Sequence, residues 1–133
     1  MRAADTALDV TTSTGARAEG RVRDAGADWV LLAPDAHAPS PSPSRERIVR
    51  VGSMVSVRGL GRSASASRSP LSARPLASIL RAWCRDRSTV DVHLADRSVV
   101  AGLALAAYAD HLDIATSGRP VSVPYAAIAV ISR

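Results

Sequence analysis

One short segment occurs twice in the chain and limits what the chain can fold into. Residues 27–32, Ala-Asp-Trp-Val-Leu-Leu, return in altered form as residues 109–114, Ala-Asp-His-Leu-Asp-Ile, 82 positions further on. The same shift aligns Gly20 with Gly102. A pattern that returns across most of a chain of 133 residues predicts two copies of one small structural unit. The alternative is chance alternation in a chain rich in Ala and Val.

The two copies differ where a loop is expected. After the repeated segment the shift between the copies falls to 72, which aligns residues 49–52 with residues 121–124. The ten extra residues of the first copy fall within residues 34–44, whose Pro and Ser content is typical of a loop. One further residue drops out before the last strand, where Val55 is expected to match Ile128. Interruptions confined to loops favour duplication over chance.

Apolar and polar residues alternate in short stretches between turn signals, which predicts five strands in each copy. Matching the copies places Val100, Gly102 and Ala104 inside the second unit, and Val30 and Leu32 inside the first. Five short strands with close turns are typical of a small barrel. The strands are expected at residues 6–12, 17–23, 29–32, 48–51 and 54–58, and again at 89–94, 98–106, 111–116, 121–123 and 127–132.

A helix is expected before the second unit. Pro75 suits a first helical turn, and the apolar residues after it follow helical spacing at Leu76, Ile79, Leu80 and Trp83. These features predict a helix at about residues 75–86. The Gly, Ser and Arg composition of residues 59–73 predicts a flexible linker. We therefore expect a mainly β chain, with one small barrel in residues 1–58 and the helix plus a second barrel in residues 74–133.

The charge of the chain has two possible explanations. All 17 basic residues are Arg, and the formal net charge is +5. Such an excess attracts nucleic acid or another polyanion. A coding bias that favours Arg and Ala together would also produce it. The scattered arginines and an aromatic content of only 3% favour the coding bias, because few rings can stack on bases.

Three features predict a cytoplasmic protein without a membrane span. Cys84 is the only cysteine, which excludes an internal disulfide and fits a reducing compartment. The first 20 residues lack the apolar core of a secretory signal. The longest apolar run, residues 99–109, is about half of the length that a membrane span needs.

The histidines and acidic residues form no motif for catalysis or metal binding. His37, His93 and His111 have no ligand spacing between them. His111 stands near Asp110 and Asp113, but a solvated strand face is the simpler explanation for this group. The sequence contains neither a phosphate-binding glycine loop nor a nucleophile motif. We therefore expect a protein that is not an enzyme and has no cofactor, metal or small-molecule substrate.

The second unit carries an apolar alternation, an Asp-Arg turn and one glycine, at Val90, Val92, Leu94, Asp96, Arg97, Val100, Gly102, Leu112, Ile114, Val121 and Val123. With the helix before it, this pattern resembles the Sm-like (LSm) fold, in which a short helix precedes five bent strands that close a small barrel. The resemblance covers residues 75–132 and, without the helix, residues 6–58. Other SH3-like barrels, including the PRC-barrel type, are similar, and residues 26–32 resemble a strand in a group of small bacterial proteins. The resemblance of both halves implies two tandem five-stranded SH3-like or Sm-like barrels.

The resemblance also implies ring assembly and binding of single-stranded RNA. Sm-like proteins contact RNA through an Asn before the third strand and an Arg-Gly pair after the fourth. Here Asp110 and its counterpart Asp28 stand at the position of the Asn, and Pro124-Tyr125 and Gly52-Ser53 replace the Arg-Gly pair. Because an Asp repels phosphate, the fold carries over more readily than the RNA site.

The first functional hypothesis is a non-catalytic interaction module that binds a protein partner or a second copy of itself. The matched copies leave apolar side chains outside both barrels, at Trp29 and Leu31 in the first and at Val99, Leu103 and Leu105 in the second. We expect the two residues of the first unit to cover the three of the second, within one chain or across a dimer. The helix is the competing cover.

The second hypothesis is binding to RNA or DNA. Its candidate residues crowd the end of the first unit and the linker, at Arg45, Arg47, Arg50, Arg58, Arg62 and Arg68. Binding of this kind weakens steeply as salt rises, because phosphate contacts release counterions.

Overall fold

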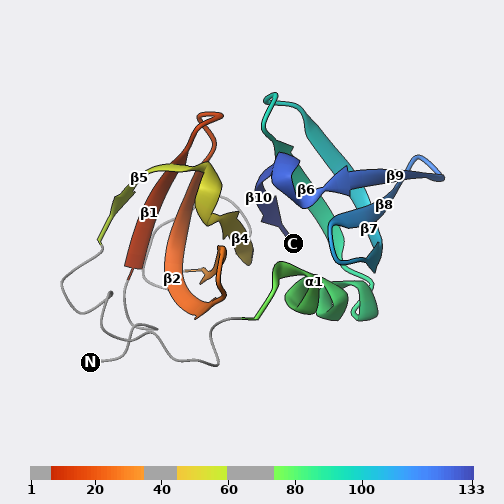
Figure 1. Cartoon of the computed structure of the whole chain (residues 1–133), viewed down its shortest axis with the longest axis horizontal. Coiled ribbons are helices and arrows are strands. Elements are labelled where there is room, and N and C mark those ends of the chain that lie inside the picture. The colour runs from red at the N-terminus through yellow and green to blue at the C-terminus, as the bar shows by residue number, and fades with distance from the viewer. Residues whose placement is uncertain (1–6, 35–44, 60–73) are drawn as a thin grey trace.

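The computed structural model of the protein describes residues 7–34, 45–59 and 74–133 (Figure 1). Most of the predicted linker, residues 59–73, therefore lies outside the described residues. The first half holds β1 (Ala7–Thr12), β2 (Arg17–Ala25), β3 (Trp29–Ala33), β4 (Arg47–Arg50), the 3₁₀ turn η2 (Val51–Ser53) and β5 (Met54–Arg58). The second half holds α1 (Leu76–Arg85), β6 (Thr89–Leu94), β7 (Val99–Ala107), β8 (His111–Thr116), β9 (Arg119–Pro124), the 3₁₀ turn η5 (Tyr125–Ala127) and β10 (Ile128–Ser132). The mainly β class is confirmed, and so is a helix before the strands of the second half.

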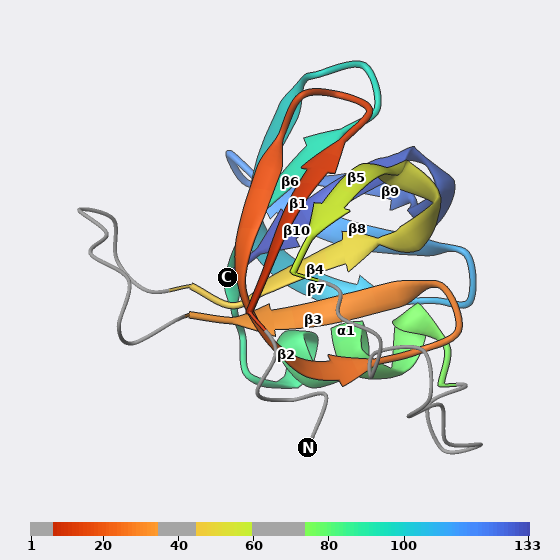
Figure 2. The ribbon, with the colours of Figure 1, turned by 90° about the vertical axis from the view of Figure 1, so that its left-hand side faces the viewer.

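The ten strands of the described residues belong to one antiparallel sheet in the order β5-β1-β2-β3-β4-β10-β6-β7-β8-β9. Within each half the order is the same: the fifth strand lies beside the first, and the fourth lies at the other end. Closing each half into its own barrel would require β4 to pair with β5 and β9 with β10. Instead β4 pairs with β10 and joins the halves (Figures 1 and 2). The sheet is open, and the predicted arrangement of two barrels is not confirmed.

The strand ladders correct the predicted size of the insertion. Trp29 faces Arg50 across β3 and β4, and its counterpart His111 faces Pro124 across β8 and β9. Trp29 and His111 are 82 positions apart, whereas Arg50 and Pro124 are 74 apart, so the first half contains eight extra residues rather than the predicted ten. The predicted shift of 72 is wrong because small apolar residues match equally well in neighbouring registers. Only the backbone pairing distinguishes those registers.

The last strand of each half keeps this shift of 74. Val57 faces Val10 across β5 and β1, and Ile131 faces Val92 across β10 and β6. The predicted loss of one residue before the last strand is therefore also wrong. Each ladder instead contains a register shift near the beginning of the fifth strand, at the same place in both halves. Such a bulge places one extra residue in the fifth strand of each half, and the alignment of the two halves stays the same.

The alignment of Gly20 with Gly102 has a packing reason. A Cβ at Gly20 would lie 2.3 Å from the carbonyl oxygen of Ala33, and a Cβ at Gly102 would lie 2.1 Å from that of Ala115. Ala33 and Ala115 are themselves 82 positions apart. Both glycines therefore allow the second strand of each half to bend closely over the third.

The core consists of two clusters, and each half completes the cluster of the other. The first cluster takes Leu32 and Val49 from the first half and Val130 from β10. The second takes Leu112 and its neighbours together with Ile48 from β4. Every residue of β10 is buried. The shared β4–β10 pair thus has buried apolar side chains on both faces. The two halves therefore form one continuous sheet rather than two separate units.

Helix α1 covers the second cluster with one apolar face. Leu76, Leu80 and Trp83 are buried on this face, and Pro75 precedes the first helical turn. The helix packs against β7 and β8 and lies next to β3 (Figure 2). Trp29, which is fully buried, joins the same cluster. No helix in the described part of the chain is long and apolar enough to cross a membrane.

Candidate functional site

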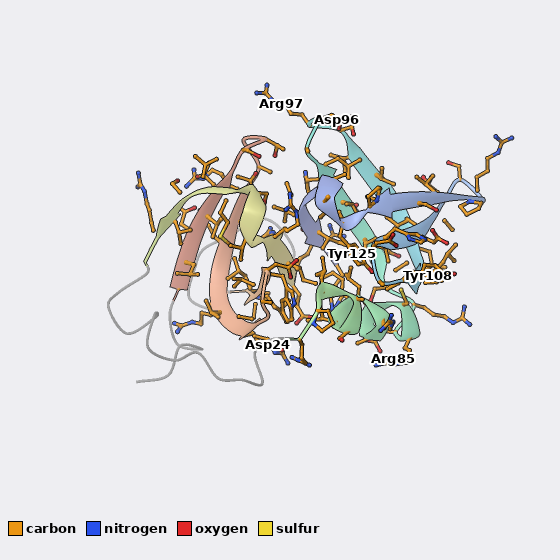
Figure 3. All side chains as sticks on the ribbon, viewed as in Figure 1. Asp24, Arg85, Asp96, Arg97, Tyr108 and Tyr125 are labelled. Carbon is orange, nitrogen blue, oxygen red and sulfur yellow. The ribbon has the colours of Figure 1, made fainter. Side chains whose placement is uncertain are left out.

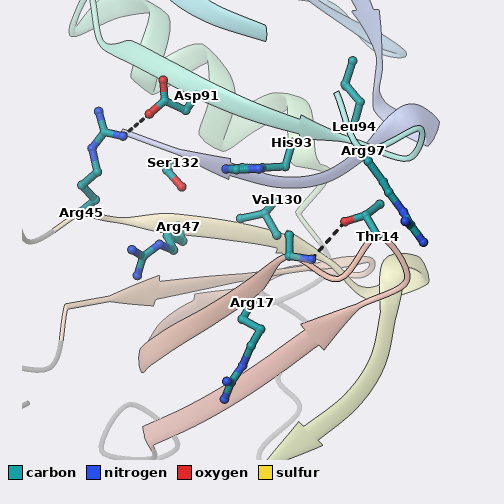
Figure 4. Close-up of a pocket in the computed structure, with 11 residues that line it drawn as sticks. Thr14, Arg17, Arg45, Arg47, Asp91, His93, Leu94, Arg97, Val130 and Ser132 are labelled. Carbon is teal, nitrogen blue, oxygen red and sulfur yellow. Dashed lines mark hydrogen bonds and ion pairs between the residues drawn. The ribbon is translucent and has the colours of Figure 1, made fainter. Parts of the chain in front are cut away.

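A groove of about 560 Å³ crosses the junction of the two halves (Figure 4). Its walls come from the β1–β2 turn, from β4 and the residues before it, from β6 with the turn after it, and from β10. The lining residues are Thr14, Ala16, Arg17, Arg45, Arg47, Asp91, His93, Leu94, Arg97, Val130 and Ser132. The site depends on the β4–β10 pair, because neither half lines the groove alone.

The register of three strands places a row of polar side chains across the floor of the groove. Arg47 on β4 faces Ser132 on β10, and Ser132 faces Asp91 on β6. Residues directly opposite each other in a sheet point to the same face. Arg45, just before β4, reaches across this row and pairs with the carboxylate of Asp91 (Figure 4). The junction thus brings arginines of the first half against β6 of the second.

A second pair of arginines comes from the two hairpin turns at one end of the groove. Arg17, at the beginning of β2, pairs with Asp9 at 2.6 Å. Arg97 lies in the β6–β7 turn with a φ of 73°, a left-handed conformation that few residues with a side chain adopt. The neighbouring Asp96 accepts a hydrogen bond from the backbone N–H of Ser98 at 2.9 Å, which holds this turn. Figure 3 shows Arg97 projecting from the tip of the turn.

The positive charge of the groove is only partly compensated. Among the described lining residues Asp91 is the single carboxylate, against four arginines, of which Arg17 is paired with Asp9 and Arg45 with Asp91. Nη1 of Arg47 approaches only the carbonyl oxygen of Glu19, at 3.4 Å. Within the described residues, the guanidinium of Arg97 forms neither a hydrogen bond nor an ion pair. The groove therefore presents guanidinium donors that remain available to an anion.

The remaining lining determines which anion the groove can hold. The hydroxyl groups of Thr14 and Ser132 add small polar donors, and Ala16, Leu94 and Val130 supply apolar surface. Among the described residues, the imidazole of His93 is the one aromatic ring that lines the groove, so the groove offers little surface for stacking of bases. The chemistry fits phosphate or carboxylate groups held by charge and hydrogen bonds.

The arginines predicted for nucleic-acid binding divide into four groups. Arg45 and Arg47 line the groove. Arg50 does not: its Nε donates to the carbonyl oxygen of Ile128 at 2.8 Å and its Nη2 to that of Ala126 at 3.1 Å, so it ties β4 to the η5 turn. Arg58 lies on the outer strand β5. Arg62 and Arg68 lie outside the described residues.

Sequence reasoning missed Arg17, His93 and Arg97 as members of this site. They lie on β2, on β6 and in the β6–β7 turn, and nothing in their local sequence distinguishes them from other exposed residues. Only the order of the strands in the sheet brings them beside Arg45 and Arg47. These residues could therefore be found only once the order of the strands in the sheet was known.

The residues predicted for a partner interface do not form one surface. Trp29 and Leu31 are buried in the second core cluster, beside α1. Val99 and Leu105 are 52% and 45% exposed, and Leu103 is partly exposed. The predicted cover of these three residues by Trp29 and Leu31 is wrong, because α1 and the second core take up both side chains instead.

The group around His111 has a local structure of its own. Nδ1 of His111 lies 2.6 Å from Oδ1 of Asp110, and its ring stacks on Tyr108 with 4.6 Å between the ring centroids. The hydrogen bond from His111 lowers the pKa of Asp110 below its ordinary value. Asp113 accepts a hydrogen bond from Ser122. Across the described ranges, no three His, Cys, Asp or Glu side chains lie close enough together to hold a metal ion.

No family model, no curated protein and no solved structure matches the chain.

Proposed function

We propose that this chain is a non-catalytic binding module whose arginine-lined groove holds the phosphate backbone of a nucleic acid. The observation that carries the proposal is the convergence of four arginines from both halves on one groove with a single carboxylate. Arginine binds phosphate through planar, paired N–H donors, and its charge persists at any physiological pH. The net charge of +5 supports attraction of a polyanion over a distance.

The composition of the groove favours binding that does not depend on base sequence. Contacts to phosphate fix a nucleic acid in place, whereas sequence is recognised through base edges or stacked bases. The described lining residues of the groove include no Phe, Tyr, Trp, Asn or Gln, and the imidazole of His93 is the one ring among them. We therefore expect similar affinity for nucleic acids of different sequence.

A salt titration tests this proposal. Fluorescence anisotropy with labelled RNA and DNA oligonucleotides measures the affinity as the salt concentration rises. Arg17 and Arg45 are paired with carboxylates, so Arg47 and Arg97 are the arginines available to phosphate. If each of the two contacts one phosphate, affinity falls on the order of 10-fold between about 50 and 200 mM salt. Absence of binding at the lower salt concentration would overturn the proposal. So would displacement by polyglutamate as readily as by unlabelled nucleic acid, because the ligand would then be any polyanion rather than phosphate.

Matched single variants locate the binding site. Arg97→Gln in the β6–β7 turn and Arg119→Gln at the beginning of β9 each remove one exposed guanidinium. Neither guanidinium has a partner among the described residues. Only Arg97 lines the groove. Arg97→Gln should weaken binding and reduce the salt slope by about 1, whereas Arg119→Gln should leave both unchanged. An equal loss in the two variants would mean that overall charge, not the groove, binds the ligand.

We also infer that the two halves are tandem copies of one Sm-like or SH3-like unit. The support is the identical strand order of the halves and their constant shifts of 82 and 74. The glycines at positions 20 and 102, each packed against a counterpart carbonyl group, add to it.

A further inference from the structure

The open sheet has two outer strands, β5 in the first half and β9 in the second (Figure 1). An outer strand presents unpaired N–H and C=O groups, to which another strand can bind. The backbone hydrogen bonds show which residues of β5 and β9 present these groups. They also show that the two edges differ.

Proline closes the β9 edge. The N–H of Tyr125 donates to the carbonyl oxygen of Asp110 at 3.0 Å, in the same register as the β8–β9 ladder. Because the direction of the backbone groups alternates along a strand, Val121 and Val123 also point toward β8, and the residues between them point outward. Two of the three outward positions are Pro120 and Pro124. A proline has no N–H, so β9 retains only the outward N–H of Ser122.

The β5 edge has no such protection. The N–H of Thr12 donates to the carbonyl oxygen of Ala16 in the register of the β1–β2 ladder, so Thr11, the next residue along β1, points toward β5. Thr11 faces Ser56, which therefore points inward, and Val57 points outward. No proline occurs in β5. Within β5, Val55 is 68% exposed.

We propose that β5 is an interaction surface through which two copies of the chain pair in antiparallel fashion about a twofold axis. Val57 of one copy faces Val57 of the partner subunit, and each donates its outward N–H to the carbonyl oxygen of the other. In this register Ser56 faces Arg58 of the partner subunit. The two arginines therefore do not face each other.

A second copy of β5 fits this edge better than the alternative strand of the same protein. Within the sheet, the fourth strand of one half, β4, pairs with the fifth strand of the other half, β10. The same kind of pair at the β5 edge would use β9, the fourth strand of the second half, from another molecule. Pro120 and Pro124 remove two of its three outward donors. A second β5 has its donor at Val57 and no proline nearby. The pairing is isologous, the commonest arrangement among dimers.

The solution mass at rising protein concentration tests the proposal, together with two matched proline variants. Val57→Pro removes the outward N–H of β5, while Ser56 and Arg58 keep their bonds to β1. Ser122→Pro removes the last outward N–H of β9 as a control. We expect a dimer for the natural chain and for Ser122→Pro, and a monomer for Val57→Pro. A natural chain that stays monomeric, or a dimer that only Ser122→Pro splits, would overturn the proposal.

Hydrogen exchange of the Val57 amide gives a second readout that needs no variant. In a β5-paired dimer this amide is protected at high protein concentration and exchanges freely on dilution. Free exchange at all concentrations would contradict the pairing, and so would protection in a monomer, because a segment of the same chain would then cover the edge. Neither result depends on nucleic acid, so this test is independent of the function proposed for the groove.

Discussion

The indole Nε1 of Trp29 donates a hydrogen bond to the backbone carbonyl oxygen of Arg74 at 2.9 Å. This bond ties β3 of the first half to the residue that leads into α1 of the second. The guanidinium of Arg74 lies 6.0 Å from the ring centroid of Trp29 and pairs with Asp24. The tryptophan therefore connects the two halves at a place distant in sequence from the β4–β10 ladder.

Truncation of Trp29 should destabilise the whole chain. Trp29→Ala removes a fully buried ring, which costs about 3–5 kcal/mol of unfolding free energy. Trp29→Phe keeps most of the packing and loses the hydrogen bond, so its own loss should be smaller, at about 1–2 kcal/mol. Urea unfolding followed by circular dichroism measures both values. Equal losses in the two variants would contradict the role of packing.

The two counterpart glycines should be intolerant of a methyl group. Gly20→Ala and Gly102→Ala each place a Cβ within 2.3 Å of a backbone carbonyl oxygen, which forces the sheet to shift. We expect a loss of about 1–3 kcal/mol in each, as for other overpacked sites. Gly118→Ala is the control, because a Cβ there meets nothing within 4 Å and costs only the strain of its φ of 78°. Thermal unfolding compares the three variants. A control that loses as much as the other two would show that space is not the cause.

The stability of the chain should fall at high pH because of Tyr125. Burial raises the pKa of this phenol to about 12 from its ordinary value of 10.0. The folded chain thus retains the proton longer than the unfolded chain. This contribution to stability is present below pH 10 and is lost as the pH rises toward 12. Denaturant unfolding across this range should show a smaller loss in Tyr125→Phe than in the natural chain. Equal losses would mean that other groups dominate.

Removal of the single carboxylate in the groove should strengthen anion binding. Asp91 pairs with Arg45, so Asp91→Asn frees this guanidinium for a phosphate. We expect tighter binding of a labelled oligonucleotide and a salt slope that is steeper by about 1. Asp113→Asn removes one charge outside the groove and serves as the control. An unchanged slope in Asp91→Asn would show that Arg45 does not contact the ligand.

The positions of the strands and of the helix were predictable because their signals are local. Alternation every second residue indicates a strand, and the spacing of Leu76, Leu80 and Trp83 indicates a helical face. The same alternation separated Leu32, in the first core cluster, from Trp29 and Leu31, in the second. Periodicity within one segment therefore determined which face of a strand is apolar, but not what covers that face.

The partners of each strand were decided only by the tertiary structure. The pairing of β4 with β10 left the sheet open, buried Trp29 under α1 and brought Arg97 to the same groove as Arg47. The shift of 74 and the outward direction of Pro124 also follow from backbone ladders alone. Short strands of Val, Ile and Ala fit several neighbours and registers almost equally well, so their own sequence does not select one. The selection comes from burying both faces of the β4–β10 junction at once, which is a property of the assembled sheet.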